Sequence, residues 1–501
     1  MASDPNDRAL LISPAYDISA YGSAESLGLR SVAATLLRES AEVCVVDECP
    51  GEVPAGVAKF AASARLIGVG VLFTRQVPAA LELISTLRAV APAAHLILGG
   101  QGVQFLWQRV LQDSSALDSV CLYEGDDTVR DLWRCLRAGR SFNTIPGLAY
   151  RNGGQITADP RSPVEDLDAL PFPYRRAGTG VYRDGVATMS TSRGCMAHCT
   201  FCQSGNYGNR YHRLPRWRSR SAKNVVAEVA ELIREHDVTA ISFVDDDFFG
   251  GDAQGHERAY EIARLLRGLP RRIRFSIECR INELDADLLL TLRAAGLRRV
   301  LIGIEAANDA DLALFAKKTT NAQAERAISL LRRLEIDFTI GFIMFQPQSS
   351  LGGVRENLDF LYRLRLGTYR RIANRLELYP GAPLNGYFRR RGVALRESAY
   401  RVDYDFTDAS VAVLRRSFLD VLEPYTHVER RCQTALFRCI TTDQIEQAGR
   451  LKQIAKDISE ALVDHAIRCW ERVASGAEPD MDPDMRSAVT RRVQVLGGAI
   501  N

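Results

Sequence analysis

The first third of the chain alternates short apolar runs with longer stretches in which leucine, valine and alanine recur at helical spacing. The apolar runs occupy residues 9–13, 42–47, 66–73, 95–100 and 119–125. Continuous apolar runs bounded by turn residues predict buried strands, and the amphipathic stretches between them, such as 26–40 and 78–91, predict helices. Strand–helix alternation is typical of an α/β fold, so we predict a doubly wound, Rossmann-like parallel sheet in a domain of residues 1–150.

Residues 151–185 are rich in proline, glycine, aspartate and arginine and show no sustained period, which predicts a linker or strap on the surface. The alternation restarts in residues 186–384. The strand candidates there are 186–191, 240–246, 273–279, 299–305, 337–345 and 371–379. Six strand–helix units fall short of the eight of a closed barrel, so we expect a partial (β/α)6 barrel of the TIM type. Residues 385–501 have no alternating strand pattern and predict a mainly helical C-terminal domain.

The bulk composition narrows the class of protein. The 501 residues are 46% hydrophobic and 25% charged, as in ordinary globular domains. A net charge of only +3 argues against nucleic-acid binding. No apolar run approaches the roughly 18 residues of a membrane span, and the N-terminus lacks the basic segment of a signal peptide. We therefore expect a cytoplasmic protein whose eleven cysteines are reduced thiols rather than a disulfide framework.

Three of these cysteines are crowded into the segment RGCMAHCTFC, directly after the first strand of the second unit. Thiolates of Cys195, Cys199 and Cys202 can hold three irons of a cubane cluster and leave the fourth iron without a protein ligand. An open coordination position distinguishes a reactive metal centre from a structural one. The spacing therefore predicts a reactive iron–sulfur site at the end of a strand.

Two other interpretations of this segment stay open. A structural zinc site would take His198 or His212 as its fourth ligand, although zinc sites usually combine a CxxC pair with a distant second pair. Three buried cysteines without a ligand would need neither the tight spacing nor the place after a strand.

The CxxxCxxC spacing, with Phe201 just before the last cysteine, resembles the signature of the radical S-adenosylmethionine (SAM) enzymes. In that family a [4Fe-4S] cluster binds SAM at its vacant iron and splits it to a 5′-deoxyadenosyl radical, inside a six-unit partial barrel. The resemblance implies that Cys195, Cys199 and Cys202 are catalytic and bind the metal. It implies contacts with SAM at Phe201, Asp245, Asp246, Glu278, Arg280 and Glu305. For the three acids that end the second strand, a solvated turn or a divalent-ion site remains an alternative.

The preceding sheet domain resembles the cobalamin-binding domain of B12-dependent radical SAM enzymes. The matching segments are SLGLRSVAATLL, GGQG, YEGDD, IPGLAYRNG and DLDALPFP. The chain lacks the DxHxxG motif whose histidine ligates cobalt in other cobalamin domains, and the single histidine before residue 198, His95, enters a strand. We therefore expect cobalamin, as methylcobalamin, without a histidine lower ligand. Strand-end position and resemblance together predict the contacts Leu72, Phe73, Thr74, Arg75, Gly99, Gly100, Gln101, Glu124 and Gly125.

These resemblances imply a radical SAM methyltransferase that methylates an unactivated sp³ carbon of a small molecule in secondary metabolism, such as antibiotic biosynthesis. Its expected partner is an external electron donor such as flavodoxin or ferredoxin, with no nucleic acid and no membrane. Arg370 and Arg371 could meet an anionic substrate, although solvated arginines are the commoner explanation. The alternative keeps both cofactors but forms, contracts or rearranges a ring without methyl transfer. A cobalamin- or light-sensing protein without catalysis would not need the three cysteines.

Overall fold

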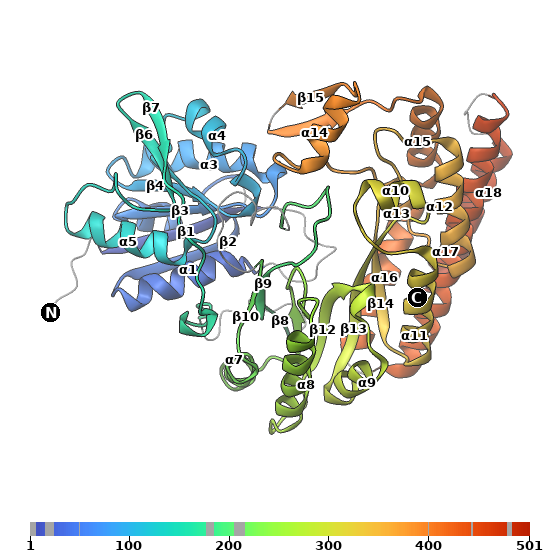
Figure 1. Ribbon diagram of the computed structural model, residues 1–501, viewed down its shortest axis with the longest axis horizontal. Helices are drawn as coiled ribbons and strands as arrows, with labels where there is room; N and C mark the ends of the chain where they lie inside the picture. Colours follow the sequence, from blue (N-terminus) through green and yellow to red (C-terminus); the bar gives the residue numbers. More distant parts are fainter. Residues whose placement is uncertain are drawn as a thin grey trace.

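The computed structural model describes residues 7–15, 25–49, 51–176, 185–204, 216–398, 400–441, 444–477 and 483–500. In these ranges the chain forms an N-terminal sheet flanked by helices, a second sheet surrounded by helices, and a layer of long C-terminal helices beside the second sheet (Figure 1). None of the helices in these ranges combines the length and hydropathy of a membrane span.

The N-terminal sheet has the order β2-β1-β3-β4-β5-β6-β7, and its first five strands run parallel. These strands are β1 (Arg8–Pro14), β2 (Glu42–Cys49), β3 (Leu66–Gly70), β4 (His95–Gly99) and β5 (Ser119–Cys121). Leu10 and Ile12 share a core with α2 (Ala55–Ala61), α3 (Val77–Val90) and α4 (Trp107–Asp113). Ala9 and Leu11 share the opposite core with α1 (Leu27–Arg38) and α5 (Gly125–Arg137). Because successive side chains of one strand enter two cores, the predicted doubly wound sheet is confirmed.

An antiparallel hairpin extends this sheet beyond the prediction. β6 (Leu148–Asn152) pairs with β5, and β7 (Gln155–Ala158) pairs with β6. The predicted strap therefore begins inside the sheet, because its first residues turn tightly at Gly153 and Gly154, which have φ angles of +56° and +87°. Such a short hairpin carries too few apolar residues to be recognised from periodicity.

The second sheet has the order β14-β13-β12-β11-β8, with every neighbouring pair parallel. Its strands are β8 (Val186–Met189), β11 (Ala240–Phe243), β12 (Arg274–Arg280), β13 (Leu297–Glu305) and β14 (Asp337–Phe342). The helices that follow the strands are α7 (Ala222–His236), α8 (Ala253–Arg267), α9 (Ala286–Ala295), α10 (Asp309–Leu314), α11 (Asn321–Arg333) and α12 (Leu351–Leu364). The sixth predicted strand contributes one parallel bridge, between Phe345 and Arg375, because α13 (Tyr369–Ala373) takes up its first residues. The result is an open, partial barrel.

The C-terminal region begins with α14 (Pro383–Arg390) and a hairpin of β15 (Leu395–Ser398) and β16 (Arg401–Tyr404), which the sequence did not predict. The helices α15 (Ala409–Leu422), α16 (Tyr425–Thr441), α17 (Ile445–Ala474) and α18 (Pro483–Ala499) follow. Lys452 of α17 forms an ion pair of 2.6 Å with Asp337 of β14. The amide of Gly367 donates to Ser459 Oγ at 2.7 Å, so α17 packs beside the edge of the barrel sheet, next to β14 (Figure 1).

Candidate active site

The cysteine loop lies at the carboxyl end of β8, directly after the short strand β9 (Ser192–Gly194), which pairs with β10 (Trp217–Ser219). Thr200 anchors the loop. Its amide donates to Phe315 O at 3.1 Å, its hydroxyl donates to Leu314 O at 2.7 Å, and its carbonyl accepts from the amide of Leu384 at 3.0 Å. The loop is therefore held from both sides by α10 and the start of α14.

Cys199 is buried, and Cys195 and Cys202 are half-buried. Burial and the nearby carboxylate of Asp247 raise the pKa of Cys195 to about 12, so a metal must displace the thiol proton to bind. Arg280 Nη1 lies 3.8 Å from Cys199 Sγ, and a cation there suits the negative charge of a thiolate-bound cluster. Three thiols on one anchored loop fit a cubane with one open iron.

The zinc alternative finds no support in this loop. Among the described residues, no three His, Cys, Asp or Glu side chains are grouped so that they could share a single ion. A cubane makes no such demand, because each thiolate binds a different iron. His198 is exposed, and its Nδ1 lies 2.6 Å from Arg216 Nη1. His212 lies outside the described residues.

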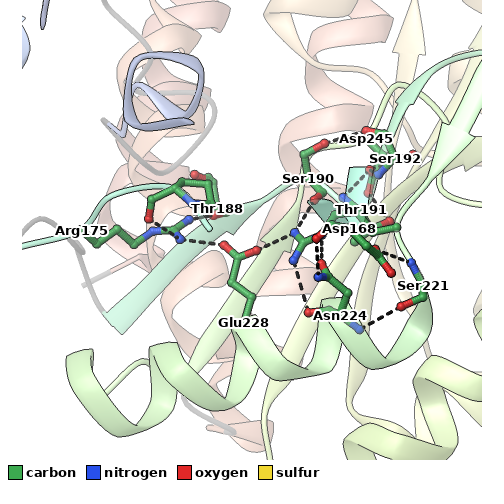
Figure 2. A network of polar contacts seen from close by, with 12 residues as sticks. Asp168, Arg175, Thr188, Ser190, Thr191, Ser192, Ser221, Asn224, Glu228 and Asp245 are labelled. Atoms are coloured by element: carbon green, nitrogen blue, oxygen red, sulfur yellow. Dashed lines mark hydrogen bonds and ion pairs between the residues drawn. The ribbon is translucent and has the colours of Figure 1, made fainter. Parts of the chain in front are cut away.

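Asp245, predicted to contact SAM, braces the junction between β8 and the cysteine loop (Figure 2). Its Oδ1 accepts from the amide of Thr191 at 2.7 Å and from the hydroxyl of Ser192 at 2.8 Å, and its Oδ2 accepts from Thr191 Oγ1 at 3.1 Å. The side chain is fully buried. These bonds engage both oxygens, so the geometry supports a positioning role, and contact with SAM stays a prediction.

The other two acids of this turn differ in their surroundings. Asp247 is buried, and its Oδ2 lies 3.7 Å from Cys195 Sγ. Asp246 is open to solvent and accepts a bond of 2.8 Å from Ser204 Oγ, yet desolvation by the surrounding protein raises its pKa. Asp246 is thus the acid of this turn that is available to a ligand.

The end of β12 brings two predicted residues toward the cysteine loop. Arg280 contacts Cys199, as described, and also donates to Lys317 O at 3.1 Å. Burial and the neighbouring Asp246 raise the pKa of Glu278 to about 7. Among the described residues, no side chain forms a hydrogen bond or an ion pair with the Glu278 carboxylate. Glu278 is therefore free to meet a ligand.

Glu305 ends β13 in a strained conformation, with a φ angle of +73° at a point where the register with β14 shifts. Its Oε1 accepts an ion pair of 3.0 Å from the buried Lys317. The sequence analysis missed Lys317. Its residue type was the one signal in the sequence, because the chain is rich in arginine and has only six lysines.

The predicted cobalamin wall follows β3. Leu72 is 54% exposed, which is unusual for a leucine at the end of a buried strand. The side chain of Gln76 fixes this turn, because its Oε1 accepts from the amides of Leu72 and Phe73 at 2.9 and 3.0 Å. Arg75 stacks on Phe73, with its guanidinium 5.0 Å from the ring centroid, whereas Thr74 is buried in the domain. The turn therefore presents an apolar surface made mainly by Leu72 and Phe73.

The glycine turn after β4 packs on the same wall. Gly100 has a φ angle of +100°, and a Cβ there would lie 2.2 Å from Val71 O, so only glycine fits. Gly99 is half-buried and Gln101 is exposed. A bulky ligand could approach this bare backbone closely. Phe201 has a different environment, since its ring packs edge-on against Phe315 at 5.3 Å in a small core.

Glu124, predicted to face the corrin ring or its nucleotide tail, connects the N-terminal sheet to the strands β9 and β10, and its contact with cobalamin stays a prediction. Its Oε2 accepts from Arg193 Nη1 of β9 at 3.0 Å, and its carboxylate also pairs with Arg218 of β10. Arg193 forms a second ion pair, of 2.8 Å, with Asp126. Gly125 begins α5, where a Cβ would come within 3.2 Å of Val32. Arg193 was not predicted, although it stands only two residues before Cys195.

His95 lies at the amino end of β4, the end opposite to the predicted cobalamin wall. Its Nε2 lies 2.7 Å from Ser119 Oγ, and burial lowers its pKa to about 4. Its position supports the interpretation of His95 as a strand residue rather than a cobalt ligand.

A second contact brings the carboxyl ends of the two sheets together. Gly381, in the turn before α14, has a φ angle of +80°, and a Cβ there would lie 2.1 Å from the ring of Phe105. Gln203 Nε2 donates to Pro380 O at 3.2 Å and so ties the same turn to the cysteine loop. The strand ends of the first domain, the cysteine loop and the mouth of the barrel therefore meet at one interface.

Two family models match successive parts of this chain. The model of the radical SAM superfamily matches residues 189–361, and that of the B12-binding domain matches residues 15–133. The chain belongs to the cobalamin-dependent radical SAM enzymes. The radical SAM domain implies a [4Fe-4S] cluster and SAM, and the B12-binding domain implies cobalamin.

Curated relatives of this family are similar over about half of their own length. The uncharacterized methyltransferase PH0819 of Pyrococcus horikoshii is 27% identical over 275 residues, which are 54% of this chain and 58% of the relative. The anaerobic magnesium-protoporphyrin IX monomethyl ester cyclase of Cereibacter sphaeroides is 27% identical over 347 residues, which are 66% of this chain and 53% of the relative.

Two solved structures of the family share the fold. The cobalamin-dependent SAM radical enzyme OxsB with aqua-cobalamin bound superposes with a TM-score of 0.75 at 18% identity, over 98% of this chain and 80% of OxsB. The radical SAM methyltransferase TsrM of Kitasatospora setae, with tryptophan substrate and a SAM analogue bound, has a TM-score of 0.66 at 19% identity, over 78% of this chain and 79% of TsrM. The likeness to OxsB extends through the helical C-terminal region.

Proposed function

We propose that this enzyme transfers a methyl group from SAM to an unactivated sp³ carbon of a small molecule. The observation that carries the proposal is the ion pair between Arg193 and Glu124, because it fixes the cysteine loop against the strand ends of the B12-binding domain. When bound, the cluster supplies the electron that splits SAM, and cobalamin supplies a methyl carrier. Methylation of an activated atom would need no radical, so both groups at one interface point to an inert carbon.

The residues of this chain have separate tasks in such a reaction. Cys195, Cys199 and Cys202 hold the cluster, and Asp245 keeps their loop in place through Thr191 and Ser192. Leu72 and Phe73 offer an apolar face to the corrin. A reaction of this kind requires that the interface keep water and other reactants away from a carbon radical. One turnover replaces C–H by C–CH₃, consumes two SAM and two electrons from a donor such as flavodoxin or ferredoxin, and releases 5′-deoxyadenosine, methionine and S-adenosylhomocysteine.

The test is an anaerobic assay of the reconstituted enzyme with SAM labelled in its methyl group and candidate intermediates from neighbouring biosynthetic genes. We expect labelled product, with one 5′-deoxyadenosine and one S-adenosylhomocysteine for each methyl group transferred. The cyclase relatives favour a second candidate, the formation or rearrangement of a ring. Unlabelled product without S-adenosylhomocysteine would exclude methyl transfer and establish that candidate.

A further inference from the structure

The inner face of the barrel carries a polar layer near the amino ends of the strands. In β13, Val300, Ile302 and Ile304 are buried in the core shared with the outer helices, so the alternate residues, which include Arg299, face the interior. The strand register places Arg299 beside Ser276 of β12 and Asp337 of β14. The positively charged side chain of Arg299 therefore belongs to the inner wall of the barrel.

Among the described residues, no side chain forms a hydrogen bond or an ion pair with the Arg299 guanidinium. Burial lowers its pKa, and the carboxylates of the neighbouring Asp337 and of Glu278 offset this only in part. Asp337 is bound by Lys452 at 2.6 Å. A half-buried arginine inside a barrel without a bonded partner is typical of a site that a ligand completes.

A second arginine reaches the same place from α13. Arg371 Nη1 donates to Leu366 O at 2.7 Å, and Nη2 donates to Thr339 Oγ1 at 2.8 Å, one layer above Arg299 in the register. Burial lowers the pKa of Arg371 to about 10; the carboxylate of Glu429 opposes this shift, and the nearby charge of Arg299 adds to it. Two like charges held close together favour the binding of an anion between them.

We propose that Arg299 and Arg371 bind an oxyanion of the substrate, a carboxylate or a phosphate, inside the barrel. The planar guanidinium of arginine matches both groups in a bidentate geometry. This inference rests on the proposed function, because it assumes that the substrate enters the barrel. It narrows the substrate to small molecules that carry a negative group remote from the reacting carbon.

The carboxylate of SAM does not explain this site. The family signature places SAM at the cluster, and Arg280, which contacts Cys199, pairs in register with Gly303. Arg299 precedes Gly303 by four residues, which is about 13 Å at the rise of a strand. The carboxylate of a SAM molecule bound at the cluster therefore cannot also reach Arg299.

The experiment uses the enzyme loaded with cluster and hydroxocobalamin, in chloride buffer. Binding of inorganic phosphate and, separately, of acetate is measured by calorimetry on the wild type, Arg299→Gln and Arg298→Gln. Arg298 is the matched control, because it adjoins Arg299 but donates to the carbonyls of Arg293 and Leu297 instead. We expect Arg299→Gln to weaken binding by about tenfold or more and Arg298→Gln to leave it unchanged. The two anions show which oxyanion the site prefers.

A second readout separates binding from a structural role. Without added anion, Arg299→Gln should melt at a higher temperature than the wild type, because it removes a charge that nearby carboxylates compensate only in part. Equal anion affinity in the two variants, no binding to the wild type, or a lower melting temperature for Arg299→Gln would each overturn the proposal. Cleavage of SAM by the wild type is assayed in parallel. Its absence would count against the proposed function, whereas equal anion affinities with normal cleavage would refute only the anion site.

Discussion

Arg193 Nη1 lies 3.0 Å from Glu124 Oε2, so the residue two positions before the first cysteine of the loop is bonded to the carboxyl end of the B12-binding sheet. Arg218 shares the same carboxylate, and its side chain is only 8% exposed. The cysteine loop is thereby positioned by a domain that contributes none of its thiols.

Replacing Glu124 by Gln should loosen this joint. The change leaves Arg218 without its anion and Arg193 with Asp126 alone, and we expect a loss of about 3 kcal/mol in the free energy of unfolding, measured by urea denaturation. Glu39→Gln is the control, since its partner Arg134 is 53% exposed and the pair lies within one domain. The control should cost less than about 1 kcal/mol. Equal losses of unfolding free energy in the two variants would contradict a special role for the Glu124 ion pairs between the domains.

Replacing Cys195, Cys199 or Cys202 by alanine should abolish both the cluster absorbance and the formation of 5′-deoxyadenosine, because two thiolates cannot hold a cubane with one open iron. Iron analysis after anaerobic reconstitution checks this. Cys135→Ala, in α5 of the other domain, should retain wild-type iron. Full iron content in any one of the three loop variants would disprove the ligand assignment.

Asp245→Asn should damage the cluster site without removing a ligand. The amide nitrogen cannot accept the bonds that Thr191 and Ser192 donate, and a buried unsatisfied donor costs about 1–3 kcal/mol. We expect reduced iron loading and an altered electron paramagnetic resonance spectrum of the cluster. Asp252→Asn, which changes only the N-cap of α8, is the control and should load iron normally. An unchanged cluster spectrum in Asp245→Asn would remove Asp245 from the support of the loop.

His95→Ala should leave corrinoid binding intact. The paramagnetic resonance spectrum of the cob(II)alamin state should show no nitrogen coupling from a protein histidine, in the wild type or the variant, because His95 is buried at the amino end of its strand. Nitrogen coupling that disappears in the variant would identify His95 as the lower ligand after all.

Glu278→Gln should change how stability depends on pH. The pKa of Glu278 is about 7 in the folded chain, above its ordinary value of 4.5, so the folded state binds the proton more tightly. This stabilisation is fully present below about pH 4.5 and is lost as the pH rises through about 7, a difference of about 3 kcal/mol. At pH 8 the variant should therefore unfold at higher urea than the wild type, and at pH 4.5 the difference should vanish. If the variant and the wild type differed in stability by the same amount at both pH values, titration of Glu278 would be ruled out as the cause of the difference.

The fold was largely predictable because it depends on local patterns. Continuous apolar runs such as 66–73 and 95–100 correctly predicted buried parallel strands, and restarted alternation correctly predicted a second α/β unit. The short hairpins β6–β7 and β15–β16 carry too few apolar residues for their periodicity to be recognised. The sixth strand failed to form as predicted because residues 369–373 became a helical turn.

The site residues that lie together in one short segment of the chain could be predicted. The residues that bond to partners distant in the sequence could not be assigned a role. The cysteine spacing identifies its own loop, whereas polar strand ends suggest ligand contacts without showing which carboxylates the protein itself uses. Glu124 meets an arginine 69 residues away in the chain, and Asp245 meets hydroxyls more than 50 residues away. The partner of Glu124 is brought to it only when the two domains meet, and the partners of Asp245 only when β8 and β11 pair in the barrel sheet.

The contact of Gly381 with the ring of Phe105 sets the spacing between the two domains at this point. An aromatic ring of one domain rests on bare backbone of the other, so even a methyl group at 381 would force the domains apart. A longer side chain at 381 could be accommodated only together with a smaller one at 105. The two positions therefore constrain each other, and a change at one limits what the other can accept.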